Sequence, residues 1–146
     1  MRCLILDAEG VVIDTEPLWD RSQAVLLREY GMEYDRQKIK KLLAGNSFID
    51  GTKILMKYCN STESFDFFLN KRKEIIYSLF NEGIKFVEGF ERFYFIVKNK
   101  FNLCIATSLN RELLSLAIDK LKLHSYFDNI FSIDEIKCPP KPDPSI

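Results

Sequence analysis

Two short apolar runs lie far apart in the chain, and their separation limits the folds available to it. Residues 2–6 and 101–106 are rich in Leu, Ile and Cys. We predict that both are strands and that the first, which lacks polar alternation, is buried on both faces of a parallel sheet. Nearly a hundred residues separate them, whereas a strand–helix–strand unit needs about thirty. The excess, residues 16–86, is therefore predicted to form a separate unit.

The rest of the chain reads mainly as helices. The predicted helices span residues 17–30, 35–43, 47–58, 62–80 and 90–98, and a last one runs from a cap at Ser108 or Asn110 to Leu121. A third short strand is predicted at residues 130–133. This order predicts the α/β class: a Rossmann-like parallel-sheet core from residues 1–15 and 87–146, with a helical cap over residues 16–86 inserted after the first strand.

Composition excludes several classes of protein. Lys plus Arg and Asp plus Glu both total 21, so the net charge is zero and no broad positive field for nucleic acid is expected. A hydrophobic content of 47% supports a folded core. The longest apolar runs are too short for a bilayer, and Asp7 interrupts any signal-peptide pattern. Four scattered cysteines with no Cys-x-x-Cys fit a reducing cytoplasm.

Polar residues follow each predicted strand. Asp7 and Glu9 come after the first, Thr107 and Ser108 come after the second and open a helix, and Lys141 lies after the third. Ligands of open parallel sheets gather outside the carboxyl ends of the strands. Carboxylates, hydroxyls, helix N–H groups and a cation at one edge suit a dianionic phosphoryl group.

Three segments, in order, resemble motifs of the haloacid dehalogenase-like (HAD-like) hydrolase superfamily. Residues 4–16 resemble the first motif, residues 105–108 the second, and residues 126–130 followed by 141–144 the third. Residues 14–19, Asp-Thr-Glu-Pro-Leu-Trp, are similar to those of sugar phosphatases and phosphomutases of the β-phosphoglucomutase type. The resemblance covers nearly the whole sequence.

The resemblance implies a mechanism. Asp7 would attack phosphorus and form an aspartyl-phosphate, and Glu9 would act as general acid and then as base. Thr107 and Lys141 would bind the phosphoryl oxygens, with Ser108 beside them. Mg²⁺ would lie between the Asp7 carboxylate, the backbone carbonyl of Glu9 and an acidic residue of a fourth motif. The implied activity is a Mg²⁺-dependent phosphohydrolase that acts on a small phosphorylated metabolite of the sugar phosphate kind.

The predicted cap carries weaker candidates. Gly45 and Asn46, followed by Ser47, resemble the substrate-specificity loop of the family, and Lys73 lies where the related mutase has a lysine that contacts substrate. The alternative interpretations are a loop glycine between two helices, and a solvated helix face over residues 71–73.

Two features depart from the family pattern. Glu9 stands where the family has a second aspartate, and a misplacement of about 1 Å can lower a rate about 10²-fold. The sequence also ends before the fourth motif, so we expect a C-terminally incomplete core with the first strand at the sheet edge. Such an edge predicts strand exchange or a dimer through that strand. A fragment, a weakly active remnant and a partner that completes the sheet remain alternatives.

The sequence is also compatible with other functions. A non-catalytic or weakly active HAD-fold binding protein would account for Glu9 and the early end. A haloacid dehalogenase, which needs the aspartate nucleophile and no Mg²⁺, ranks lower because residues 14–17 and 141–142 look more like the phosphate branch. A receiver domain is disfavoured, since its acceptor aspartate follows a middle strand. A dinucleotide-binding role lacks a Gly-x-Gly-x-x-Gly after any strand.

Overall fold

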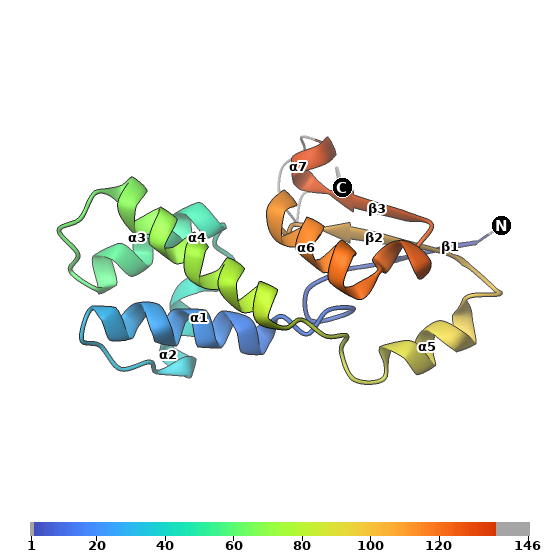
Figure 1. Ribbon diagram of the computed structural model, residues 1–146, viewed down its shortest axis with the longest axis horizontal. Coiled ribbons are helices and arrows are strands. Elements are labelled where there is room, and N and C mark those ends of the chain that lie inside the picture. Colours follow the sequence, from blue (N-terminus) through green and yellow to red (C-terminus); the bar gives the residue numbers. More distant parts are fainter. Residues whose placement is uncertain (1, 137–146) are drawn as a thin grey trace. The chain divides into compact units, whose positions relative to one another are not determined.

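The computed structural model describes residues 2–136 (Figure 1). It divides the chain into two compact units. The sheet unit holds the chain up to Glu16 and from Phe80 onward, and the helical unit is Pro17–Leu79. Within the described residues, no helix has both the length and the apolar character that crossing a membrane requires.

The sheet unit is built on three parallel strands, β1 (Cys3–Leu6), β2 (Asn102–Thr107) and β3 (Asn129–Ser132). They lie in the order β1-β2-β3, and both pairings are parallel (Figure 1). Parallel strands need crossover connections, which the helices between them supply. The predicted α/β class and parallel sheet are confirmed.

Strand β1 is more exposed than the sequence predicts. We expected both faces to be buried, but Ile5 is 63% exposed and Cys3 is exposed. Among the described residues β1 pairs with β2 alone, so it forms an edge of the sheet. An apolar run indicates that a segment suits burial, but not which element covers it. Strand exchange through this edge stays a prediction.

Helices of the sheet unit share one hydrophobic core with the strands. They are α5 (Phe90–Val97), α6 (Arg111–Leu121) and the 3₁₀ turn η1 (Leu123–Ser125), while the short helix α7 (Ile133–Ile136) follows β3. The core joins side chains from β2, α5, α6 and η1, among them Phe90, Val97, Leu103, Ile105, Ala117 and Leu123. This packing fixes the place where β2 ends and α6 begins.

The helical unit contains α1 (Glu16–Glu29), α2 (Arg36–Leu43), α3 (Phe48–Tyr58) and α4 (Phe65–Glu82). Asp35 caps α2 by accepting the N–H of Lys38, and Ser47 caps α3 by accepting that of Asp50. The buried core of this unit includes Leu26, Leu27, Ile39, Leu55 and Phe68. Its role as a cap on the sheet unit stays a prediction.

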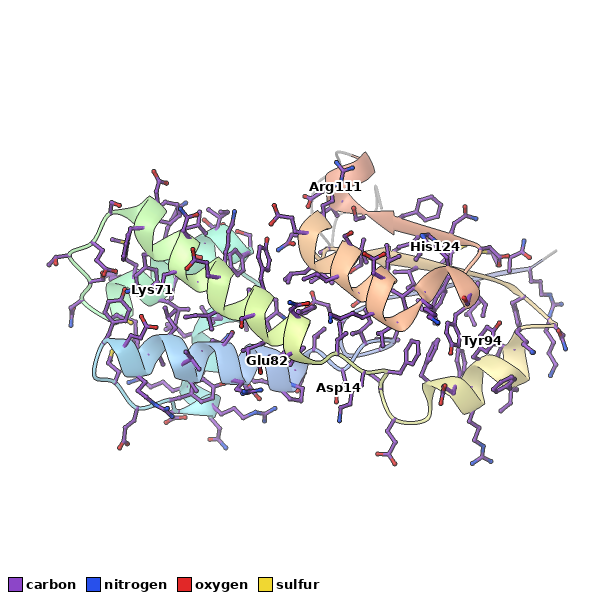
Figure 2. All side chains as sticks on the ribbon, viewed as in Figure 1. Asp14, Lys71, Glu82, Tyr94, Arg111 and His124 are labelled. Carbon is purple, nitrogen blue, oxygen red and sulfur yellow. The ribbon has the colours of Figure 1, made fainter. Side chains whose placement is uncertain are left out.

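A polar cluster on the helical unit joins α1, α4 and the loop before α4. Lys71 (Figure 2) lies 3.3 Å from carboxylate oxygens of Glu29 and Glu63 and 3.2 Å from the Tyr30 hydroxyl. The Tyr30 hydroxyl also donates to the Glu63 carboxylate. This hydrogen bond, together with Lys71, holds the pKa of Glu63 below its ordinary value.

The lowered pKa of Glu63 predicts a pH-dependent stability. Its stabilising contribution is present above the ordinary glutamate pKa, about 4.3, and is lost as pH falls through the lower folded-state pKa. We therefore expect Glu63→Gln to lower the urea midpoint at about pH 7, and we expect the difference from wild type to shrink as pH falls below about 4.3. A midpoint difference that stays constant over this pH range would contradict the prediction.

Candidate active site

The carboxyl ends of the three strands meet at one edge of the sheet. Leu6 pairs in register with Ile105, and Thr107 pairs with Ser132. Asp7 directly follows Leu6, so the same register places it level with the end of β2. The structure therefore brings Asp7 and Thr107, which are distant in the sequence, to the same edge, as ligand sites of parallel sheets require.

The chain folds tightly on itself directly after Asp7. The N–H groups of Val12 and Ile13 donate to the Ala8 carbonyl at 3.0 and 2.8 Å, and the Gly10 N–H donates to the Ile13 carbonyl at 2.8 Å. Gly10 has a φ of 70°, a conformation that side chains with a Cβ disfavour. Ala8 is fully buried while Asp7 is half-buried. The turn thus anchors its apolar residues and leaves Asp7 partly accessible.

Glu9 lies on the same turn as Asp7 and is also half-buried. It forms an isolated bridge with Ile13, which in turn bridges Phe86. The backbone of Glu9 is therefore fixed by the fold, although its side chain is one methylene longer than aspartate. Because the backbone is fixed, the longer side chain holds the carboxyl group at a different position from that of an aspartate carboxyl group. Proton transfer to a substrate depends on this position.

Thr107 ends β2 with a fully buried side chain, whereas the next residue, Ser108, is exposed. The Leu109 N–H donates to Thr107 Oγ1 at 3.0 Å. Because this bond uses the oxygen as an acceptor, the hydroxyl hydrogen is left to donate elsewhere. The turn thus prepares Thr107 as a hydrogen-bond donor at the same edge as Asp7.

Thr107→Val tests this turn. Valine has nearly the same shape, but it leaves the N–H of Leu109, a residue 2% exposed, without its acceptor. We expect the free energy of unfolding to fall by about 1–3 kcal/mol, because a buried donor loses its partner. Urea denaturation measures this change. Thr107→Ser keeps the hydroxyl and serves as the control, and equal losses in the two variants would contradict the assignment.

Side chains already occupy part of the N-terminus of α6. The Leu113 N–H donates to Asn110 Oδ1 at 2.9 Å, and the Arg111 N–H (Figure 2) donates to Asp134 Oδ2 at 2.8 Å. Asn110, one of the two expected caps, is the N-cap. Two N–H groups at the start of this helix are thus bonded to side chains, and the phosphate-binding roles of Thr107 and Ser108 stay predictions.

Asp134 is a residue near the candidate site that sequence reasoning missed, and its observed role is structural. It lies on α7, just after β3, and ties that segment to the start of α6 across 23 positions of sequence. A carboxylate shortly after the third strand was the available signal. Nothing in its local sequence shows which helix it caps, because that depends on how the strands are ordered in the sheet.

The helical unit holds the three weaker candidates. Gly45, with a φ of 73°, and Asn46 are exposed in the connection between α2 and α3, where the Asn46 side chain donates to the Ala44 carbonyl at 3.1 Å. Lys73 is half-buried on α4, and its side chain has no hydrogen bond or ion pair among the described residues. Its contact with substrate stays a prediction.

One predicted site residue, Lys141, lies outside the described residues, as does the segment 141–144 of the third motif.

The resemblance to the family implies a Mg²⁺ ion at the turn after β1. Within residues 2–136, no group of three or more His, Cys, Asp or Glu could hold a metal ion. The turn does offer the Asp7 carboxylate and the Glu9 backbone carbonyl, two residues apart. Mg²⁺ in proteins binds one or two carboxylates and keeps several waters. The two oxygen ligands of this turn are therefore of the chemical type that Mg²⁺ prefers.

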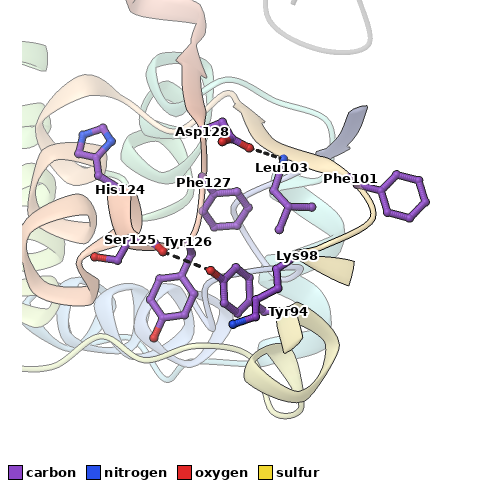
Figure 3. A pocket seen from close by; sticks show the side chains of 9 residues that line it. All are labelled: Tyr94, Lys98, Phe101, Leu103, His124, Ser125, Tyr126, Phe127 and Asp128. Carbon is purple, nitrogen blue, oxygen red and sulfur yellow. Dashed lines mark hydrogen bonds between the residues drawn. The ribbon is translucent and has the colours of Figure 1, made fainter. Parts of the chain in front are cut away.

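A small pocket lies near the start of β2, at the other end of this strand from Thr107 (Figure 3). It has a volume of about 150 Å³, and its lining includes Tyr94, Lys98, His124 and Asp128. Asp128 accepts the Leu103 N–H at 2.8 Å, near the start of β2. Since neither Asp7 nor Thr107 lines this pocket, it is separate from the candidate site.

The sequence model of a family described as haloacid dehalogenase-like hydrolase matches residues 4–146. The chain belongs to this family. The resemblance drawn from the three motifs is confirmed, and the parallel sheet with an aspartate after β1 agrees with it.

Two curated proteins match over most of the chain. The chain is 29% identical over 147 residues to a phosphorylated carbohydrates phosphatase of Thermotoga maritima, covering 100% of this chain and 67% of that protein. It is 28% identical over 138 residues to an uncharacterised protein of Haemophilus influenzae, covering 92% and 66%. The chain thus spans about two thirds of the length of these relatives.

Solved structures agree with this assignment. A Thermotoga maritima protein provisionally assigned as a β-phosphoglucomutase superposes with a TM-score of 0.78 at 28% identity, covering 95% of this chain and 64% of that one. A HAD family hydrolase of Deinococcus radiodurans, with bound phosphate and sodium, has a TM-score of 0.74 at 19% identity and covers 97% and 62%. The second likeness supports the fold alone.

Proposed function

We propose that the protein is a Mg²⁺-dependent phosphohydrolase that acts on a small phosphorylated metabolite through an aspartyl-phosphate. The observation that carries this proposal is the register that brings Asp7 and Thr107 to one edge of the sheet. A carboxylate nucleophile beside a hydroxyl donor is the minimum that phosphoryl transfer by covalent catalysis needs. Membership of a hydrolase family supports the same reaction class.

Asp7 and Glu9 take part directly in the steps that form and break bonds. An Asp7 carboxylate oxygen bonds to phosphorus as the bond from phosphorus to the leaving oxygen breaks, and protonated Glu9 gives its proton to that oxygen. Glu9, now a carboxylate, takes a proton from water. The water oxygen attacks phosphorus, and the bond to Asp7 breaks to release inorganic phosphate.

The other residues hold the phosphoryl group. Thr107 donates its hydroxyl to one phosphoryl oxygen, Ser108 contacts the group from the same turn, and Lys141 supplies a positive charge. The Asp7 carboxylate and the Glu9 carbonyl would hold Mg²⁺, which would offset the negative charge. Together these contacts lower the repulsion between a carboxylate nucleophile and an anionic ester.

The proposed substrate class is a sugar phosphate or a similar metabolite, and Gly45, Asn46 and Lys73 contribute to its recognition. Similarity to a protein named a phosphorylated carbohydrates phosphatase supports this choice. The free thiols Cys3, Cys59 and Cys104 support a reducing compartment, and we place the protein in the cytoplasm.

Phosphate release from a panel of sugar phosphates and simple phosphate esters tests the proposal. We expect turnover with Mg²⁺ and loss of turnover with EDTA, since the ion offsets charge in the proposed site. A metal-independent rate, or no release from any ester, would overturn the proposal.

A non-catalytic binding protein of the same fold is the second candidate, and Glu9 in place of the family's aspartate favours it. This candidate predicts no turnover over the whole panel, together with saturable binding of a phosphorylated metabolite in a calorimetric titration. Hydrolysis of any panel member at a rate that depends on Asp7 would reject it.

A further inference from the structure

Arg72 on α4 is a buried cation without a carboxylate partner. The residue is 6% exposed, and in the described part of the chain it forms no ion pair. Its Nη1 donates to the Phe48 carbonyl at 2.8 Å and to Thr52 Oγ1 at 2.7 Å. Its Cζ lies 4.2 Å from the centroid of the Phe48 ring. These contacts are all directed at Phe48 and Thr52, near the start of α3.

The contacts of Arg72 close a small hydrogen-bonded network. The Thr52 hydroxyl accepts from Arg72 and donates to the Phe48 carbonyl at 2.7 Å. A Cβ at Gly51 would lie 3.4 Å from Nη1, an ordinary van der Waals distance, so the guanidinium packs close beside the Gly51 backbone. The guanidinium fork also covers the face of the Phe48 ring, which adds a cation–π contact. Phe48 is thus held by its carbonyl and by its ring.

Phe48 directly follows the exposed loop that carries two of the candidate substrate residues. Gly45 and Asn46 precede Ser47, the N-cap of α3, and Phe48 is the first residue of that helix. A clamp on Phe48 therefore fixes the carboxyl end of the loop. The loop itself is exposed, and its own hydrogen bonds are local, from Asn46 to Leu43 and Ala44 and between Ser47 and Asp50. The clamp adds a contact from the end of the loop to α4.

The three consecutive cations on α4 have different environments. Lys71 pairs with Glu29 and Glu63, Arg72 is buried against α3, and Lys73 has no partner among the described residues. Burial lowers the pKa of Arg72 to about 10, so the guanidinium keeps its charge at neutral pH. The interpretation of residues 71–73 as a solvated face is wrong for Arg72.

We propose that Arg72 is a positioning residue, which fixes the loop at residues 45–47 by clamping Phe48 and thereby sets which leaving group the enzyme accepts. The effect on the leaving group rests on the proposed phosphohydrolase function. The clamp itself does not, because it is a property of the helical unit alone.

Trp19 offers a readout of the clamp that needs no turnover. It is the only tryptophan in the chain, and its ring centroid lies 5.9 Å from that of Phe48. A shift of Phe48 changes the packing around Trp19, and hence its access to a quencher. Acrylamide quenching of tryptophan emission therefore follows the geometry of the clamp.

Two variants weaken the clamp, and a third serves as the matched control. Arg72→Lys keeps the charge but loses the planar fork, and Thr52→Val removes one acceptor at nearly constant shape. Lys71→Met changes the neighbouring cation on the same helix and disturbs the Glu63 cluster instead. We expect increased quenching of Trp19 in the first two variants and wild-type quenching in the third.

Selectivity for the leaving group is the second readout. It is the ratio of kcat/KM for a hexose 6-phosphate to that for p-nitrophenyl phosphate, and the fraction of folded enzyme cancels in it. We expect this ratio to fall about tenfold in Arg72→Lys and Thr52→Val, because small displacements of binding groups are costly. The ratio should keep its wild-type value in Lys71→Met, although that variant loses stability.

The outcomes separate this proposal from the proposed function. If wild type hydrolyses no ester, the phosphohydrolase and its selectivity fail together, and quenching alone decides the clamp. If Arg72→Lys does not fold, as judged by circular dichroism, Thr52→Val decides. Wild-type quenching and a wild-type ratio in Thr52→Val would overturn the proposal, as would an equal fall of the ratio in Lys71→Met.

Discussion

Asp7→Asn is expected to lower kcat by at least about 10³-fold, since removal of a nucleophile takes away the covalent pathway. Asparagine matches the size of aspartate, so the turn after β1 and its backbone hydrogen bonds at Ala8 and Gly10 should persist. The variant should keep the wild-type free energy of unfolding and lose its phosphohydrolase activity. This combination separates a nucleophile from a carboxylate that only supports the fold.

Acid quenching during turnover of a ³²P-labelled ester measures the intermediate directly. Wild type should retain label on the protein, and Asp7→Asn should retain none. Asp119→Asn makes the same chemical change on an exposed residue of α6 in the same unit and should retain label as wild type does. Equal turnover by wild type and Asp7→Asn would end the assignment of Asp7 as nucleophile.

Much of the fold was predictable because its signals are local. Ser47 and Asp35 cap helices where the sequence pattern placed helix starts, and the structure assigns both as N-caps. The crossover of nearly a hundred residues between the first two strands required an inserted unit, whatever its packing. Parallel pairing then placed Asp7 and Thr107 at one edge, without any knowledge of their side-chain contacts.

The remaining features depend on contacts between residues far apart in the sequence. The edge position of β1 agrees with the expected incomplete core, but the exposure of Ile5 was not predicted, because an apolar run does not show which element covers its face. Arg72 is buried because α3 approaches α4 at Phe48, whereas its neighbours in sequence suggest solvent. Asp134 accepts the Arg111 N–H from 23 positions away in the sequence. In each case tertiary packing overrides the local pattern.

Substitution of Glu9 is the second change with a large expected effect on kcat, and its result distinguishes an enzyme from a binding protein. Its backbone is fixed by the bridge to Ile13, so the extra methylene moves the carboxyl group and not the chain. We expect Glu9→Asp to raise kcat by about tenfold to 10²-fold, because a proton donor misplaced by about 1 Å works slowly. Glu9→Gln should lower kcat by about 10²–10⁴-fold, since it cannot exchange a proton.

A comparison of kcat for one sugar phosphate and one p-nitrophenyl ester checks both variants. Loss of the general acid should cost more with the sugar, whose alkoxide leaves poorly without a proton, than with the nitrophenolate, which leaves without help. Equal losses for the two esters in Glu9→Gln would contradict the role of Glu9 as an acid. If wild type is inactive and Glu9→Asp hydrolyses esters, the fold retains the geometry for catalysis, and the glutamate itself accounts for a binding role.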